Sequence, residues 1–275
     1  MRNRSVSVAP HLVDYPPRMT ANQPDQSNGD MQNYRLTLAY DGREFMGWQR
    51  HGDQRTVQGI LEASIESAFA QRVSVQGAGR TDRGAHADGQ VASVALAHGL
   101  AVGDVLARLG GELPADIVLL DVAEAHANFH ARTSAIGKTY GYRIWNAQDC
   151  PESELGRVWN SARPLDVASM QEAAGVLVGE HDFASFATKA NFKQRSTVRK
   201  LQSLEILIEA RIIEFSFVAD SFLYKMVRNL VRAIVKVGEG RSDKAKLASI
   251  LAAKDRSAAP GTAPASGLCL KSVHY

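Results

Sequence analysis

Apolar and polar side chains alternate along several short segments of the chain, and this period of two predicts β-strands. Tyr34, Leu36, Leu38 and Tyr40 share one face of the first such segment. The same pattern predicts strands over residues 34–40, 73–79, 90–96, 117–122, 138–145, 201–208, 212–217 and 267–274. A sheet with an apolar face is therefore expected.

Between these strands, apolar residues recur at every third or fourth position, which predicts helices that pack one side on a sheet. Thr56 is the expected N-cap of one helix, with Val57, Ile60, Leu61 and Ile65 inward. Helices are predicted over residues 57–69, 102–110, 166–177, 221–237 and 242–253. The two halves of the chain repeat this layout. It predicts an α+β fold of two related lobes, each an antiparallel or mixed sheet with helices packed on one face, and an active-site cleft between them.

The chain divides into three parts. Residues 1–31 contain four prolines and a polar run without a sustained apolar period, so we expect a mobile N-terminal tail. Met19 or Met31 is a candidate for the true start of the protein. Residues 32–135 are predicted to form an N-terminal α+β lobe that carries a glycine-rich loop, and residues 136–275 a C-terminal α+β lobe.

Composition narrows the class of protein. The chain has 275 residues, is 45% hydrophobic and carries a net charge of +3, so a nucleic-acid surface has to come from local clusters of basic residues. Cys150 and Cys269 are the only cysteines, which excludes a CxxC zinc site and a disulfide framework and favours a cytoplasmic protein with reduced thiols. No apolar run is long enough to span a bilayer, and no signal-peptide pattern is present, so no membrane association is expected.

The glycine-rich loop at residues 77–88 joins two predicted strands. Its glycines let a ligand approach the backbone closely. Asp82 is anionic at neutral pH, and Arg80, two residues earlier, can hold its carboxylate in a fixed direction. From composition alone, the loop is either a tight turn with a surface ion pair or a functional site. His86 and Asp88 shape the loop or contact a ligand, and the sequence does not decide between these roles.

Several other kinds of site find no support in the sequence. His86, His126 and His130 resemble a set of metal ligands, but no glutamate follows His126 as a zinc peptidase requires, so no metal is expected. The loop around Asp82 lacks the Gly-Lys-Ser/Thr ending of a phosphate-binding P-loop. The chain also has no serine in a G-x-S-x-G turn.

Basic residues form a stripe on the helix predicted at residues 221–237. Lys225, Arg228, Arg232 and Lys236 are spaced by three and four positions and therefore share a face. A further basic run contains Lys189, Lys193, Arg195, Arg199 and Lys200, with Phe192 among them. Basic side chains near aromatic rings suit phosphate contact and base stacking. The alternative is a solvated helix surface, and the spacing alone leaves both open.

Tyr140 and Tyr142 share a face of the strand predicted at residues 138–145. Two tyrosines in this arrangement are usually core residues or cross-strand partners. One of them could instead present its ring to a base and its hydroxyl to a reacting group.

Blocks of sequence along the chain resemble the TruA family of tRNA pseudouridine synthases. Residues 79–87, GRTDRGAHA, are similar to the family's catalytic GRTDxGVHA motif, with Ala85 in place of the usual Val. Ala233 stands where Gly is common, and residues 1–31 lie outside the resemblance. The other blocks occur in family order: YDG at residues 40–42 with GWQR at 47–50, FHARTSA at 129–135 with KTYGY at 138–142, SFLYKMVRNLV at 221–231, and GL at 267–268 with VHY at 273–275.

The resemblance implies a catalytic set and a substrate. Asp82 matches the family's catalytic Asp, which links covalently to the target nucleoside. Arg80 matches the Arg that pairs with it, and Tyr140 the Tyr that stacks on the target base and takes part in proton transfer. The family isomerises uridines at positions 38, 39 and 40 in the anticodon stem-loop of tRNA, needs no cofactor, and works as a homodimer that holds one tRNA. The candidate substrate-binding residues are then Arg80, Tyr140, Lys225, Arg228 and Arg232.

The chemistry of this isomerisation suits these residue types. The N-glycosidic bond of uridine breaks, the base rotates and C5 joins C1′, without a redox step or hydrolysis. A carboxylate can act as the nucleophile, and the sequence leaves open whether Asp82 attacks C1′ or assists elimination to a glycal. A proton must then leave C5, and Tyr140 is the nearest candidate base. The stacked uridine must first be flipped out.

Two other functions would use parts of the same residue set. A non-catalytic RNA-binding protein with the same scaffold would keep the basic stripe but lose Asp82 or Tyr140, and both residues are present. A carboxylate-dependent hydrolase of nucleosides or sugars would need a second acidic partner, and Asp88 is the only other acid in the loop. The sequence therefore favours the isomerase.

Overall fold

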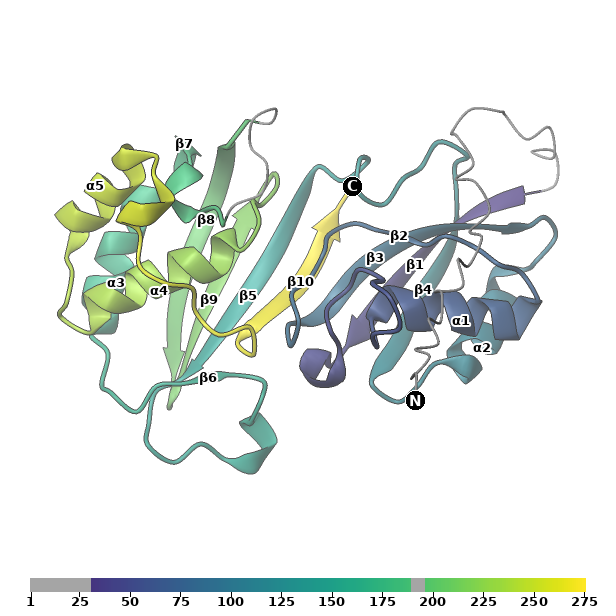
Figure 1. The fold of residues 1–275 in the computed structure, drawn as a ribbon, viewed down its shortest axis with the longest axis horizontal. Coiled ribbons are helices and arrows are strands. Elements are labelled where there is room, and N and C mark those ends of the chain that lie inside the picture. Colours follow the sequence, from purple (N-terminus) through teal and green to yellow (C-terminus); the bar gives the residue numbers. More distant parts are fainter. Residues whose placement is uncertain (1–30, 189–195) are drawn as a thin grey trace, which may run out of the picture. The chain divides into compact units, whose positions relative to one another are not determined.

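The computed structural model of the chain describes residues 31–188 and 196–275 (Figure 1). Of the predicted tail at residues 1–31, only Met31 is described, and it opens the first strand. The basic run at residues 189–195 also lies outside the described residues. The helices are α1 (Val57–Phe69), α2 (Val102–Glu112), α3 (Val167–Ala174), α4 (Met226–Gly238) and α5 (Lys244–Ala253). None of the helices in the described ranges is long and apolar enough to cross a membrane.

The strands of the described residues form one ten-stranded sheet, in the order β4-β1-β3-β10-β5-β9-β8-β7, with β2 beside β3 and β6 beside β5. They are β1 (Met31–Tyr40), β2 (Gln76–Gly77), β3 (His86–Ala97), β4 (Ile117–Ala125), β5 (Gly137–Trp145), β6 (Trp159–Asn160), β7 (Gly179–Asp182), β8 (Val198–Glu209), β9 (Ile212–Ala219) and β10 (Leu268–His274). The last strand, β10, runs parallel to β3 and antiparallel to β5 (yellow in Figure 1). The predicted α+β class with a mixed sheet is confirmed.

Strand β10 joins the parts of the sheet that come from the two halves of the chain. Residues 32–135 supply β4, β1 and β3, and residues 136–275 supply β5, β9, β8 and β7. The C-terminal strand lies between these two groups, so the sheet continues from one to the other. The division into two lobes at residues 135 and 136 stays a prediction.

The strand predicted at residues 73–79 is much shorter in the structure. Only the two residues of β2 pair with β3. Side chains of α1 satisfy the backbone of Val75 instead: its N–H donates to the Glu62 carboxylate at 3.1 Å, and its carbonyl accepts from the Gln58 amide at 3.2 Å. The alternation of apolar and polar residues does not indicate that helix side chains, and not a neighbouring strand, bind this part of the backbone.

The helix predicted from Ser221 begins five residues later, at Met226. Lys225 has a left-handed backbone with φ 60°, which is incompatible with a continuing right-handed helix. The segment from Ser221 to Lys225 is therefore a separate turn before α4. Most other predicted elements are confirmed within a few residues.

One row of side chains crosses the middle of the sheet on its apolar face. Tyr40 lies opposite Ala87, which lies beside Leu270 on β10. Leu270 lies opposite Tyr140, which in turn lies opposite Phe217. All five side chains are at most 8% exposed. Tyr40 and Tyr140 therefore lie on the same face of the sheet, although they come from different halves of the chain.

The other face of the sheet is polar near this row. Because side chains alternate along a strand, the residues next to the row point away from the core. Among them, Lys271 donates to Asp88 at 2.9 Å, and these side chains are 35% and 60% exposed. The two faces thus differ in character at the centre of the sheet.

Candidate active site

The glycine-rich loop before β3 is held by the segment that follows β1. The Trp48 N–H donates to the Thr81 carbonyl at 3.1 Å. The Gly84 N–H donates to the Phe45 carbonyl at 3.3 Å. These bonds fix the backbone on both sides of Asp82.

Two glycines in the segment after β1 allow this close contact. A Cβ on Gly42 would lie 1.9 Å from the Ala85 carbonyl oxygen, and a Cβ on Gly47 would lie 2.8 Å from the Thr81 carbonyl oxygen. Gly47 also has φ +94°, which other residues rarely adopt. The loop and its support therefore pack backbone against backbone, with no space for a side chain between them.

Buried hydroxyls link the loop to the sheet. The Tyr40 and Thr81 hydroxyl oxygens lie 2.8 Å apart. The Gln90 amide donates to the Tyr40 oxygen at 3.3 Å and to the Gly79 carbonyl at 2.8 Å. Burial raises the pKa of Tyr40 well above its ordinary value, so its hydroxyl stays protonated and can donate to Thr81. The network fixes the loop over the central row of the sheet.

Asp82 forms a salt bridge with Arg228, the third residue of α4. The side chains of the aspartate and the arginine are only 16% and 13% exposed. The Nε of Arg228 also donates to the Ala263 carbonyl at 2.7 Å, so two acceptors fix the guanidinium. A charge-assisted bond of this kind orients the carboxylate as well as stabilising its charge.

Arg80 lies in a different place from the one predicted. Its side chain is exposed, and within the described residues it forms no salt bridge with Asp82. The pairing expected between Arg80 and Asp82 is therefore made by Arg228 in this structure. The sequence predicts Arg228 on the basic stripe and as a substrate-binding residue, and no spacing rule connects it with a residue 146 positions earlier.

Tyr140 lies on β5 in the central row, and its ring meets that of Phe222 edge-on with centroids 5.0 Å apart. Burial raises the pKa of Tyr140 well above its ordinary value, and the neighbouring Tyr40 and Asp82 raise it further. The phenol is therefore protonated at neutral pH. Its hydroxyl makes no hydrogen bond to any other part of the described chain, so it is available to a ligand.

Comparison with known proteins shows the family to which the chain belongs. The sequence profile of a family described as tRNA pseudouridine synthase matches residues 37–133 and 173–275. The chain belongs to the tRNA pseudouridine synthase family. Members of this family are isomerases, so the predicted enzyme class and the resemblance to the family are both confirmed.

Relatives of this tRNA pseudouridine synthase family member align over most of its length. The tRNA pseudouridine synthase A of Methylacidiphilum infernorum is 40% identical over 88% of this chain and 95% of its own. The namesakes from Solidesulfovibrio magneticus and Rhodospirillum rubrum are 43% and 42% identical over 89% of this chain, and over 92% and 88% of their own. A solved structure of the archaeal box H/ACA sRNP Nop10-Cbf5 complex aligns with 74% of this chain and 44% of its own, at 17% identity and a TM-score of 0.32.

The four basic residues of the stripe on this pseudouridine synthase have different partners and surroundings. Arg232 and Lys236 both pair with Glu239, at 3.4 and 3.0 Å. The Arg232 guanidinium also lies 5.3 Å from the centre of the Trp159 ring. Lys225 precedes α4 and is half-buried. Of the stripe, only Arg228 contacts Asp82.

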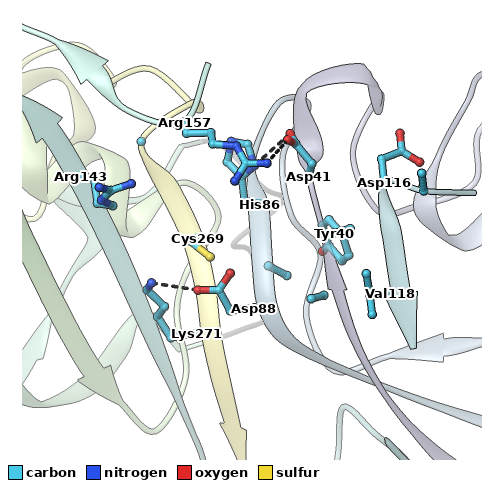
Figure 2. Close-up of a pocket in the computed structure, with 14 residues that line it drawn as sticks. Tyr40, Asp41, His86, Asp88, Asp116, Val118, Arg143, Arg157, Cys269 and Lys271 are labelled. Atoms are coloured by element: carbon cyan, nitrogen blue, oxygen red, sulfur yellow. Dashed lines mark hydrogen bonds and ion pairs between the residues drawn. The ribbon is translucent and has the colours of Figure 1, made fainter. Parts of the chain in front are cut away.

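His86, which the sequence left without a role, links three segments of the synthase. The Gly42 N–H donates to His86 Nδ1 at 3.1 Å, and His86 Nε2 lies 2.9 Å from the Gly156 carbonyl oxygen. Since a carbonyl only accepts, Nε2 carries the proton and the ring is neutral. Figure 2 shows His86 next to Asp41, which pairs with Arg157 at 2.6 Å. The end of the glycine-rich loop is thereby tied to the segments after β1 and before β6.

Asp88 lies on the polar face of the sheet, where it pairs with Lys271 beside Cys269 (Figure 2). Ala87 belongs to the central row of the other face, so Asp88 points away from that row and from Asp82. The hydrolase alternative required a second acid near Asp82, and Asp88 does not provide it.

Proposed function

We propose that this chain converts uridines at positions 38, 39 and 40 in the anticodon stem-loop of tRNA to pseudouridine, with Asp82 as the nucleophile. The observation that carries the proposal is the pair of Asp82 and Arg228, which presents one fixed carboxylate from a rigid loop over the central row that contains Tyr140. The relatives named tRNA pseudouridine synthase A support tRNA as the substrate. The positions in the stem-loop follow from the resemblance of the sequence blocks.

In the proposed reaction, the bond between N1 and C1′ breaks and its electron pair stays on the uracil. Asp82 either bonds to C1′ or assists elimination to a glycal, and both routes need a carboxylate fixed at the sugar. After the base rotates, C5 forms the new bond to C1′ and the carboxylate is released. Arg228 keeps the carboxylate oriented throughout, because it is anchored independently on the Ala263 carbonyl.

Tyr140 stacks on the flipped base, and Phe222 fixes the plane of its ring. Its phenol is protonated before the reaction, so it can act as a base only after it has donated its own proton. The uracil anion formed by glycosidic cleavage is a suitable acceptor. Tyr140 then takes the proton that leaves C5 and returns to its initial state, so the cycle is balanced without a cofactor.

The remaining predicted residues contact RNA in this proposal. Arg80, Lys225 and Arg232 bind phosphates of the tRNA, since each carries a charge at or near the surface. The protein acts in the cytoplasm as a homodimer whose two subunits together hold one tRNA, and the active-site cleft lies between the two lobes of each chain. Within the described residues, no three His, Cys, Asp or Glu side chains gather to hold a metal ion, and the absence of a cofactor stays a prediction.

Mapping of pseudouridine in tRNA treated with the purified protein tests the reaction and its target positions together. We expect product at positions 38, 39 and 40 with the unaltered protein and none with Asp82→Asn. Asp88→Asn is the matched control, because it removes a nearby carboxylate of β3 on the other face of the sheet and should leave activity intact. Product from Asp82→Asn would overturn the assignment of the nucleophile, and free uracil would indicate a hydrolase.

A further inference from the structure

Lys138 is a buried amine that the reaction outlined above does not use. It lies on β5 two residues before Tyr140, so both side chains are on the apolar face of the sheet. Lys138 is only 8% exposed, which is unusual for a lysine. It therefore belongs to the same face as the catalytic loop.

The stem of Lys138 packs on the start of that loop. A Cβ placed on Gly79 would lie 3.5 Å from Lys138 Cε and 3.4 Å from the Tyr140 hydroxyl. Lys138 Cε, which bears the amine, and the Tyr140 hydroxyl therefore both lie next to Gly79. Gly79 begins the segment that leads through Arg80 to Asp82, so the amine lies close to Tyr140 at the start of this segment.

The Lys138 amine has no anionic partner in the described part of the chain. No carboxylate there lies within 4.0 Å of it, and it donates no hydrogen bond there. Burial lowers the pKa of Lys138, the Arg132 charge lowers it further, and the Asp220 charge opposes them. A cation in these surroundings is stabilised by any anion that reaches it, because burial removes much of its hydration.

RNA supplies such an anion at every nucleotide. When a uridine is flipped into a pocket, its base enters and the phosphates on either side remain at the rim. We propose that the amine of Lys138 binds a phosphate of the RNA backbone next to the target uridine. This inference rests on the proposed function, and it adds a phosphate contact at the start of the glycine-rich loop to those proposed for Arg80, Lys225 and Arg232.

The test is the salt dependence of tRNA binding by Lys138→Met, which removes the charge and keeps the length of the stem. We expect about tenfold weaker binding at low salt, because a charged hydrogen bond is lost. The slope of log affinity against log salt should fall by roughly 0.7 to 0.9, the amount expected for one phosphate contact. Lys138→Arg should keep the slope of the unaltered protein.

Lys271→Met is the matched control. It removes one positive charge from the neighbouring strand, but on the polar face, where Lys271 pairs with Asp88. Its salt slope should equal that of the unaltered protein. An equal reduction in both variants would overturn the proposal, because the effect would then come from total charge. Should Lys138→Met fail to fold in thermal unfolding, Lys138→Gln takes its place.

Two further results separate Lys138 from other roles. Unchanged affinity and slope in Lys138→Met would overturn the phosphate contact. The same conclusion follows if its turnover at saturating tRNA falls while binding is unchanged, because the amine would then act in proton transfer. Product formation by the unaltered protein is measured separately. A protein without pseudouridine activity contradicts the proposed function, whereas the salt slopes still report on Lys138.

Discussion

Asp82 and Arg228 lie 146 residues apart in the chain, and their side chains meet in a salt bridge between the glycine-rich loop and α4. Each partner is also held by its own half of the chain. The backbone around Asp82 is fixed by the segment after β1, and Arg228 is fixed by the Ala263 carbonyl. The direction of the carboxylate therefore depends on how these parts of the fold pack together.

Replacement of Arg228 should reduce both stability and turnover. Arg228→Met leaves the largely buried Asp82 without its partner, and we expect a loss of about 1.5–3 kcal/mol in the free energy of unfolding. Turnover should fall on the order of a hundredfold or more, because the carboxylate loses its orientation. Arg228→Lys should recover only part of this, since an ammonium does not reproduce the geometry of a guanidinium with two acceptors. Denaturant unfolding and single-turnover assays measure the two effects.

Arg232→Met is the control for this prediction, because it lies on the same stripe one turn away and pairs with Glu239 instead. It should keep the turnover at saturating tRNA. Similar turnover defects in the two variants would show that the stripe acts through its charge alone. This outcome would contradict a specific role of Arg228 in orienting Asp82.

The hydrophobic pattern predicts most of the fold because its elements have an apolar side. The strand that begins at Tyr34 and the helix capped by Thr56 are examples, and the Thr56 side chain accepts the Gly59 N–H as expected of an N-cap. The pattern could not predict that β10 lies between β3 and β5, because no local property of a strand specifies its neighbours. It also missed the left-handed Lys225, since lysine has no local preference for that conformation.

The candidate site was predictable as far as it is local in sequence. Asp82 and its glycines form one motif, and Tyr140 stands out through strand alternation and the family blocks. Nearness in sequence and the family motif both point to Arg80 as the partner of Asp82, whereas the structure places Arg228 there. A tertiary contact of this kind leaves no periodic signal. Lys138 could be found from the periodic pattern, because it lies two positions before Tyr140 on the same buried strand face.

Tyr140→Phe should separate stacking from proton transfer. The variant keeps the ring against Phe222 and removes only the hydroxyl. We expect tRNA affinity to stay the same and turnover to fall by about 10²–10⁴, the range typical for a lost acid–base group. Tyr34→Phe is a control, because its hydroxyl donates to the Leu100 carbonyl away from the loop. Full turnover by Tyr140→Phe would remove the hydroxyl from the mechanism and leave only the ring.

Gly42→Ala should disturb the glycine-rich loop through the backbone. The new methyl group would lie 1.9 Å from the Ala85 carbonyl oxygen, and a main-chain atom cannot move aside as a flexible side chain does. We expect a loss of at least about 2 kcal/mol in stability, together with lower activity. Gly110→Ala is the matched control, because the same methyl group meets open space in α2 and should stabilise the helix by about 0.5–1 kcal/mol. Thermal unfolding compares them, and equal stability of the two variants would contradict the close contact.

His86 should make the stability of the protein depend on pH in mildly acidic solution. Its ring is neutral in the fold, with Nδ1 accepting from Gly42 and Nε2 donating to Gly156. Burial lowers the pKa of His86 below its ordinary 6.5, although the Gly156 carbonyl and Asp41 partly oppose this. At pH values between the lowered pKa of His86 in the folded protein and its ordinary pKa of 6.5, the unfolded chain binds more protons than the folded chain. Stability therefore rises with pH in this window and falls as the solution is acidified below 6.5.

Replacement of His86 by Gln removes this titration, so the variant should lose less stability than the unaltered protein between pH 7.5 and 5.5. The difference should be at most about 1.4 kcal/mol, which corresponds to one pH unit of linked protonation. At pH 7.5 the variant should itself be less stable by about 1–3 kcal/mol, because the Gly42 and Gly156 groups lose their partner. Urea unfolding at both pH values measures these quantities, with His51→Gln as the control for an exposed histidine. If His86→Gln loses as much stability as the unaltered protein between pH 7.5 and 5.5, the titration of His86 is not the cause of the pH dependence.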